Sequence, residues 1–144
     1  MVLGEGTTSI KKAKKNVDPP PKNLPFSALV VDDDPLIRQI HSVILNSVGF
    51  KVEVAENGKE AVDLFSAGAN FHIVFIDMEM PIMNGIEATK ELRAMGVKCK
   101  IVGVTSRDSE IDKEVFMFAG LDVCYTKPLA VTMILPLMEE LLNS

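Results

Sequence analysis

The chain has 144 residues, of which 47% are hydrophobic and 6% aromatic, and it contains two cysteines and no tryptophan. This length allows one compact domain with a tail, and the composition is that of an ordinary α/β protein. Cys99 and Cys124 both lie in apolar runs, so we expect no structural disulfide and predict a reducing, cytoplasmic location. No apolar run reaches the roughly 20 residues of a membrane span, and the N-terminus lacks the apolar core of a signal peptide.

The net charge of −5 is unevenly distributed. Residues 1–25 carry five lysines against Glu5 and Asp18, a charge of +3, which leaves 10 basic and 18 acidic residues in the remainder, a charge of −8. A domain with this much negative charge is not expected to bind nucleic acid. The basic segment is predicted to be a disordered leader that can contact an acidic partner or serve nuclear import. The four prolines of DPPPKNLP place the boundary between this leader, residues 1–25, and one domain, residues 26–144.

Five short apolar runs alternate with five helical patterns from residue 26 onward. The runs are Ala28–Val31, Lys51–Ala55, His72–Ile76, Lys100–Val104 and Asp122–Thr126. Three of them are rich in Val and Ile without polar alternation, which is typical of strands covered on both faces. The alternation predicts the α/β class, as a (βα)5 doubly wound open parallel sheet with its ligand site at the carboxyl ends of the strands.

The helical patterns indicate which residues face the core. Apolar residues recur at helical spacing in the first and fourth patterns and are expected to be buried: Ile37, Ile40, Ile44 and Val48, and then Ile111, Val115 and Phe118. Asn57 with Glu60 resembles a capping box at the start of the second helix. The last pattern, Thr132–Leu142, contains Pro136. Because proline fits only within the first turn, regular helix is expected to begin close to it.

Polar side chains stand at the carboxyl ends of four predicted strands. They are Asp32, Asp33 and Asp34 after the first, Asp77 after the third, Thr105 at the fourth and Lys127 after the fifth. Each alone has a plain structural interpretation, such as a helix cap, a turn residue or a solvated lysine. Carboxylates brought together from adjacent strands repel and raise each other's pKa unless a cation joins them. Oxygen ligands with open positions suit Mg²⁺, so the set predicts a magnesium site.

Four segments carry a resemblance to a known family. VVDDDP, FIDMEMPIMNG, VGVTS and YTKP are similar, in order and spacing, to the signatures of response-regulator receiver domains, over roughly residues 26–142. The resemblance implies a flavodoxin-like receiver fold with Asp77 as the phosphoacceptor. It also implies that Asp32 and Asp33 bind Mg²⁺ together with Asp77, and that Thr105 and Lys127 contact the phosphoryl group.

The resemblance implies finer detail in two loops. The backbone carbonyl of Glu79 is expected to be a further metal ligand, and the Lys127–Pro128 peptide bond is expected to be cis. Asn84 stands where the family more often has Asp. Glu79 and Arg107 lie two residues past the phosphoacceptor and the hydroxyl residue, so their side chains are expected to pair across the site.

Within the family, the chain most resembles plant stand-alone regulators of the type-C group, with a basic leader, a DMEMP loop and no expected output domain. The implied function is that of a single-domain response regulator in a His-to-Asp phosphorelay, such as cytokinin signalling. It would accept phosphoryl groups from a histidine-containing phosphotransfer protein and act as a switch or a phosphate sink. We expect a monomer without membrane partners. We also expect a stoichiometric phosphoacceptor rather than an enzyme, with autohydrolysis and at most weak phosphohistidine-phosphatase activity.

A partner that presents phosphohistidine in line to Asp77 has to cover the rim of the site. The expected docking surface is the first helix, with Pro35, Leu36 and Ile40 or its exposed neighbours, together with the loop at Pro128. Burial of Leu36 and Ile40 in the core is the open alternative.

Two other classes stay open. A haloacid-dehalogenase-type phosphatase also places an Asp nucleophile after a strand beside Mg²⁺. That class needs a second Asp two residues after the nucleophile, where this chain has Glu79. It also normally has a cap insertion, and this chain is too short to contain one. A pseudo-receiver that only docks partners is disfavoured, because every residue type of the receiver site is present.

Overall fold

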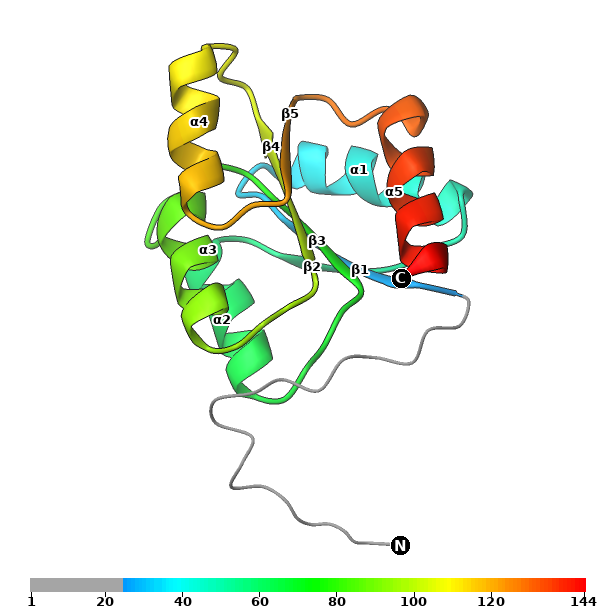
Figure 1. Ribbon diagram of the computed structural model, residues 1–144, viewed down its shortest axis with the longest axis horizontal. Helices are drawn as coiled ribbons and strands as arrows, with labels where there is room; N and C mark the ends of the chain where they lie inside the picture. The colour runs from blue at the N-terminus through cyan, green and yellow to red at the C-terminus, as the bar shows by residue number, and fades with distance from the viewer. Residues whose placement is uncertain (1–24) are drawn as a thin grey trace, which may run out of the picture.

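The computed structural model describes residues 25–144 and has a parallel sheet with helices on both faces (Figure 1). Strands and helices alternate: β1 (Ser27–Val31), α1 (Pro35–Ser47), β2 (Lys51–Ala55), α2 (Gly58–Ser66), β3 (Ile73–Ile76), α3 (Gly85–Ala94), β4 (Lys100–Thr105), α4 (Glu110–Phe118), β5 (Val123–Thr126) and α5 (Val131–Asn143). The predicted (βα)5 class is confirmed, and the strand bounds differ from the predicted ones by one residue at most.

The order of strands in the sheet determines where a ligand can bind. The order is β2-β1-β3-β4-β5, with every neighbouring pair parallel. The chain crosses from β1 to β2 in one direction and then to β3 on the other side of β1. In open α/β sheets this reversal leaves a crevice outside the carboxyl ends of the two strands. The crevice here therefore lies at the ends of β1 and β3.

Two hydrophobic cores lie on opposite faces of the sheet. Alternate strand residues contribute to them: Leu29 and Val31 pack beneath α2, α3 and α4, whereas Ala28 and Val30 pack beneath α1 and α5 (Figure 1). These side chains are at most 1% exposed. Burial of a Val or Leu side chain stabilises a fold by roughly 1.5–3 kcal/mol, so the two cores hold the carboxyl end of β1 firmly.

The predicted buried face of α4 is wrong. Ile111, Val115 and Phe118 are exposed, Phe118 by 90%, and the buried side chain is Phe116. A Cβ atom added at Gly85 or Gly103 would lie 2.9 or 2.8 Å from the Phe116 ring. The two glycines therefore leave the space that this ring fills, and the orientation of α4 follows from that fit.

The predicted face of α1 is only partly correct. Ile44 and Val48 pack against the core, but Ile40 is 38% exposed. The centre of the buried face is formed by His41 and Leu45. A buried polar residue is tolerated where it has a hydrogen-bond partner, and His41 has one in the loop after β5.

The expected start of the last helix near Pro136 is also wrong. The helix begins at Val131 and contains Pro136 in its interior. Ile134 is fully buried in the second core, which favours helix ahead of the proline. Pro136 and Thr132 are both on the exposed face, where water can replace the hydrogen bond that proline cannot donate to the Thr132 carbonyl.

The leader predicted over residues 1–25 lies outside the described residues except for Pro25, so its disorder and the domain boundary stay predictions. Within residues 25–144, no helix combines the length and the apolar character needed to cross a membrane.

Candidate functional site

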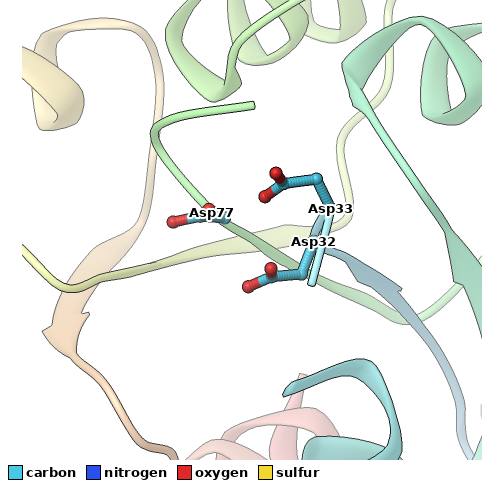
Figure 2. A group of neighbouring side chains, drawn as sticks. All are labelled: Asp32, Asp33 and Asp77. Atoms are coloured by element: carbon cyan, nitrogen blue, oxygen red, sulfur yellow. The ribbon is translucent and has the colours of Figure 1, made fainter. Parts of the chain in front are cut away.

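Three carboxylates meet in the crevice at the ends of β1 and β3. Side-chain oxygens of Asp32, Asp33 and Asp77 all lie within 4.8 Å of one another (Figure 2). Their backbones continue the sheet: the Asp32 N–H donates to the Ala55 carbonyl at 3.1 Å, and the Asp77 N–H donates to the Val31 carbonyl at 3.0 Å. Sheet hydrogen bonds therefore hold the two buried aspartates in register.

Lys127 follows β5, the strand at one edge of the sheet, and its side chain reaches the carboxylates at the ends of β1 and β3. Its Nζ lies 2.8 Å from Asp32 Oδ2 and 3.3 Å from Asp77 Oδ1. Burial by itself would lower the pKa of Lys127, but the hydrogen bond to Asp32 and the charges of both aspartates outweigh it and raise that pKa. The lysine is therefore charged at neutral pH and lies between the two carboxylates.

Ionisation of Asp77 is disfavoured in this crevice. Burial raises its pKa to about 6, with a further contribution from the charge of Asp32, although Lys127 acts in the opposite direction. Asp32 has two polar partners: its Oδ1 accepts a hydrogen bond from the Asp34 N–H at 2.9 Å, and its Oδ2 contacts Lys127. Asp33 is exposed.

The donor set suits a hard divalent cation. Three carboxylates lie together here, whereas the nearby cations are Lys127, in contact with two of them, and Arg38 at the Asp32 carbonyl, so the site carries a surplus of negative charge when all three carboxylates are ionised. Oxygen ligands of this type with an open side fit Mg²⁺. Asp32, Asp33 and Asp77 are the residues that would hold it. The further ligand predicted from the resemblance, the Glu79 carbonyl, stays a prediction.

Thr105 ends β4 beside these residues and is 1% exposed. Its Oγ1 accepts a hydrogen bond from the Arg107 N–H at 3.0 Å. Because the oxygen acts as the acceptor in that bond, the hydroxyl hydrogen is left for a second partner. The backbone carbonyl of Thr105 accepts a hydrogen bond from the Lys127 N–H at 2.8 Å, which couples the ends of β4 and β5.

Glu79 and Arg107 form the predicted ion pair between the loops after β3 and β4. Arg107 also lies 3.4 Å from Asp112 at the start of α4. The hydrogen bond from Arg107 lowers the pKa of Glu79, so the glutamate is charged. Both side chains are exposed, and an exposed pair of this kind contributes little to stability.

Two residues near the site were missed in the sequence. Arg38 Nη1 donates a hydrogen bond to the Asp32 carbonyl at 2.7 Å, and His41 accepts one from the Leu129 N–H at 3.2 Å. His41 interrupts the apolar face of α1, which was the only signal for it. The Lys127–Pro128 bond is cis, as the resemblance implied.

Comparison with protein families and curated proteins points to one family. The model of the response regulator receiver domain matches residues 28–139. Two-component response regulator 24 of Arabidopsis thaliana is 49% identical over 116 residues, which cover 81% of this chain and 84% of that protein. Two-component response regulator ARR22 of the same plant is 42% identical over 142 residues, which cover 97% of this chain and 94% of that protein.

Solved structures agree with the fold. The response regulator protein TrrA of Thermotoga maritima, in complex with Mg²⁺ and BeF, is 30% identical, with a TM-score of 0.71 over 81% of this chain and 98% of that chain. The receiver domain of Ssk1 from Saccharomyces cerevisiae was solved with the histidine phosphotransfer protein Ypd1. That match is 25% identical, with a TM-score of 0.69 over 77% of this chain and 84% of the other.

Asp77→Asn is expected to stabilise the metal-free protein in a pH-dependent way. The folded-state pKa of Asp77, about 6, exceeds its ordinary value of 3.8, so the folded protein loses stability as pH rises between these values. Asparagine removes that loss. The gain should be absent near pH 4 and reach about 1–2 kcal/mol above pH 6.5, after allowance for screening by solvent.

Urea denaturation in EDTA between pH 4 and pH 8 measures the effect. Glu139→Gln, at an exposed position on α5, is the control and should show no such trend. An equal gain for Asp77→Asn at pH 4 and pH 7 would contradict the explanation.

Proposed function

This chain belongs to the response regulator receiver domain family, and from that membership we propose that it accepts a phosphoryl group from a histidine phosphotransfer protein onto Asp77. The observation that carries the proposal is the meeting of three strand ends. Asp32 after β1, Asp77 after β3 and Lys127 after β5 lie in direct contact at the crevice. A nucleophile, a cation and a cation-binding carboxylate are thereby brought together.

Asp77 supplies the nucleophile. A carboxylate oxygen of Asp77 attacks the phosphorus of the phosphohistidine, an O–P bond forms, and the N–P bond breaks with its electron pair returning to the imidazole. Only the ionised carboxylate can attack. Because the pKa of Asp77 is about 6, this side chain is largely ionised at neutral pH. Little covalent chemistry is required beyond this step, so positioning and charge account for most of the rate.

Lys127 and Thr105 would act on the oxygens of the transferred group. Lys127 is charged and already within 3.3 Å of the nucleophile, so it can neutralise an oxygen as the O–P bond forms. Thr105 retains a hydroxyl hydrogen that can be donated to another of these oxygens. Bound Mg²⁺, held by the three aspartates, would supply further positive charge at the site.

The phosphotransfer partner would dock on α1 and the adjacent loops. Leu36 and Val43 are each 60% exposed and Ile40 is 38% exposed, so this helix presents an apolar strip to solvent beside the site. Exposed apolar strips of this kind are typical of interaction surfaces. The solved complex of a related receiver with a phosphotransfer protein supports this class of partner.

The proposal is tested by transfer of a radiolabelled phosphoryl group from a histidine phosphotransfer protein. We expect one label per chain, stable in acid and labile in base, and none in Asp77→Asn. Asp33→Asn, which keeps the nucleophile, should accept label at a lower rate. Repeated turnover on phosphomonoesters, or label retained in Asp77→Asn, would contradict the assignment. The direction of phosphoryl flow, followed over time, distinguishes a switch from a phosphate sink.

Leu36→Glu is expected to slow transfer from the phosphotransfer protein about tenfold, which is the range of a loss at an interface contact. Transfer from acetyl phosphate, which needs no docking surface, should change less than twofold. Leu142→Glu on α5 is a matched control, because Leu142 is also 60% exposed but lies in the last turn of that helix, at the opposite end from the loop that carries Lys127. Equal slowing with both donors would exclude α1 as the docking surface.

Replacement of both Glu79 and Arg107 by Ala is expected to shorten the lifetime of phospho-Asp77. The ion pair joins the loops after β3 and β4, and we predict that it hinders a water that approaches the phosphoryl group. Because the pair is exposed, the effect should be about two- to fivefold. The lifetime is measured by loss of label after removal of the donor, and an unchanged lifetime would refute the role.

A further inference from the structure

We propose that His41 is a positioning residue, which holds the loop that carries Lys127 by accepting a hydrogen bond from the backbone of Leu129. The inference rests on the proposed function and adds to it a residue of α1 that contacts neither the carboxylates nor the phosphoryl group.

The contact is buried and joins distant parts of the chain. The Leu129 N–H donates to His41 Nε2 at 3.2 Å across 88 residues of sequence. Both residues are 2% exposed, so water cannot replace either partner if the bond is lost. An unpaired N–H buried in this way costs more than the bond contributes when formed.

The bond completes the support of a three-residue turn. At one end the Lys127 N–H donates to the Thr105 carbonyl at 2.8 Å, and at the other the Leu129 N–H donates to His41. Pro128, between them, has no N–H to donate. The Leu129 side chain packs in the same core as Leu45, the next buried residue of α1. The loop is therefore attached to β4 on one side and to α1 on the other.

The hydrogen bond requires one tautomer of His41. A nitrogen that accepts cannot carry a hydrogen, so His41 is neutral with its hydrogen on Nδ1. Burial lowers the pKa of His41, which agrees with a neutral ring. The charge of Asp32 raises the pKa of His41 and the charge of Lys127 lowers it, so the ring lies within electrostatic reach of the site.

Loss of the His41 hydrogen bond should affect Lys127 and leave the carboxylates in place. Asp32 and Asp77 are held by sheet hydrogen bonds that His41 does not touch. Lys127 depends on the loop, and its Nζ has to stay within contact of both carboxylates. Loss of the His41 acceptor should therefore displace the ammonium group while the three carboxylates keep their places. Binding of a phosphoryl group should weaken, and binding of Mg²⁺ alone should not.

The experiment compares the affinity for beryllofluoride, which stands in for the phosphoryl group, with the affinity for Mg²⁺ alone. His41→Leu keeps the volume and removes the acceptor, and we expect beryllofluoride to bind about three- to tenfold more weakly, the effect of one buried hydrogen bond. Mg²⁺ affinity should stay within twofold. His41→Gln places an amide oxygen near the former Nε2 and should recover most of the loss. Leu92→Val, a buried change in the core on the opposite face of the sheet, should leave both affinities unchanged.

A second measurement uses the unaltered protein. Imidazole ¹⁵N NMR should show the hydrogen of His41 on Nδ1, and the Leu129 amide should be protected from exchange. A hydrogen on Nε2 would overturn the proposal. So would unchanged beryllofluoride affinity in His41→Leu, or an equal loss of both affinities. If the unaltered protein bound no beryllofluoride, the proposed function would fail, and the tautomer would still decide whether the contact with Leu129 exists.

Discussion

The ion pairs of Lys127 with Asp32 and Asp77 are the interaction on which the rest of the site depends. Both aspartates are almost fully buried, and two buried carboxylates side by side are costly without a cation. Lys127 supplies one positive charge to this pair, and Asp33 adds a third carboxylate. The remaining surplus of negative charge is what makes the crevice suited to a divalent cation and to the phosphoryl group that such a cation would help to bind.

The surrounding structure holds these charges in place through the backbone. Sheet hydrogen bonds position Asp32 and Asp77, while Lys127 is reached through a turn supported by Thr105 and His41. The strands carry this arrangement because both faces of the sheet are packed. The site itself opposes stability, since burial keeps the pKa of Asp77 high, and the two cores offset that cost. A rigid scaffold with one strained charge cluster is a common arrangement at functional sites.

The errors made from the sequence share one physical cause. In α4, the stripe of Ile111 and Phe118 and the neighbouring stripe with Phe116 both fit a helix, so periodicity alone does not choose between them. The choice follows from the space left at Gly85 and Gly103, which belong to other elements. His41 was overlooked for the same reason. Its partner, the Leu129 N–H, is 88 residues away and is a backbone group with no sequence signature.

The sequence by itself determined the alternation of strands and helices, the strand bounds to within a residue, and the presence of acidic, hydroxyl and lysine side chains at strand ends. These features are local, since a run of Val and Ile or an aspartate after it is visible in a few residues. Tertiary structure alone decided which helix faces are buried, how far α5 extends ahead of Pro136, and which groups support Lys127. Those outcomes depend on contacts between distant segments, where shape, burial and a single hydrogen bond select among arrangements that the local pattern allows equally.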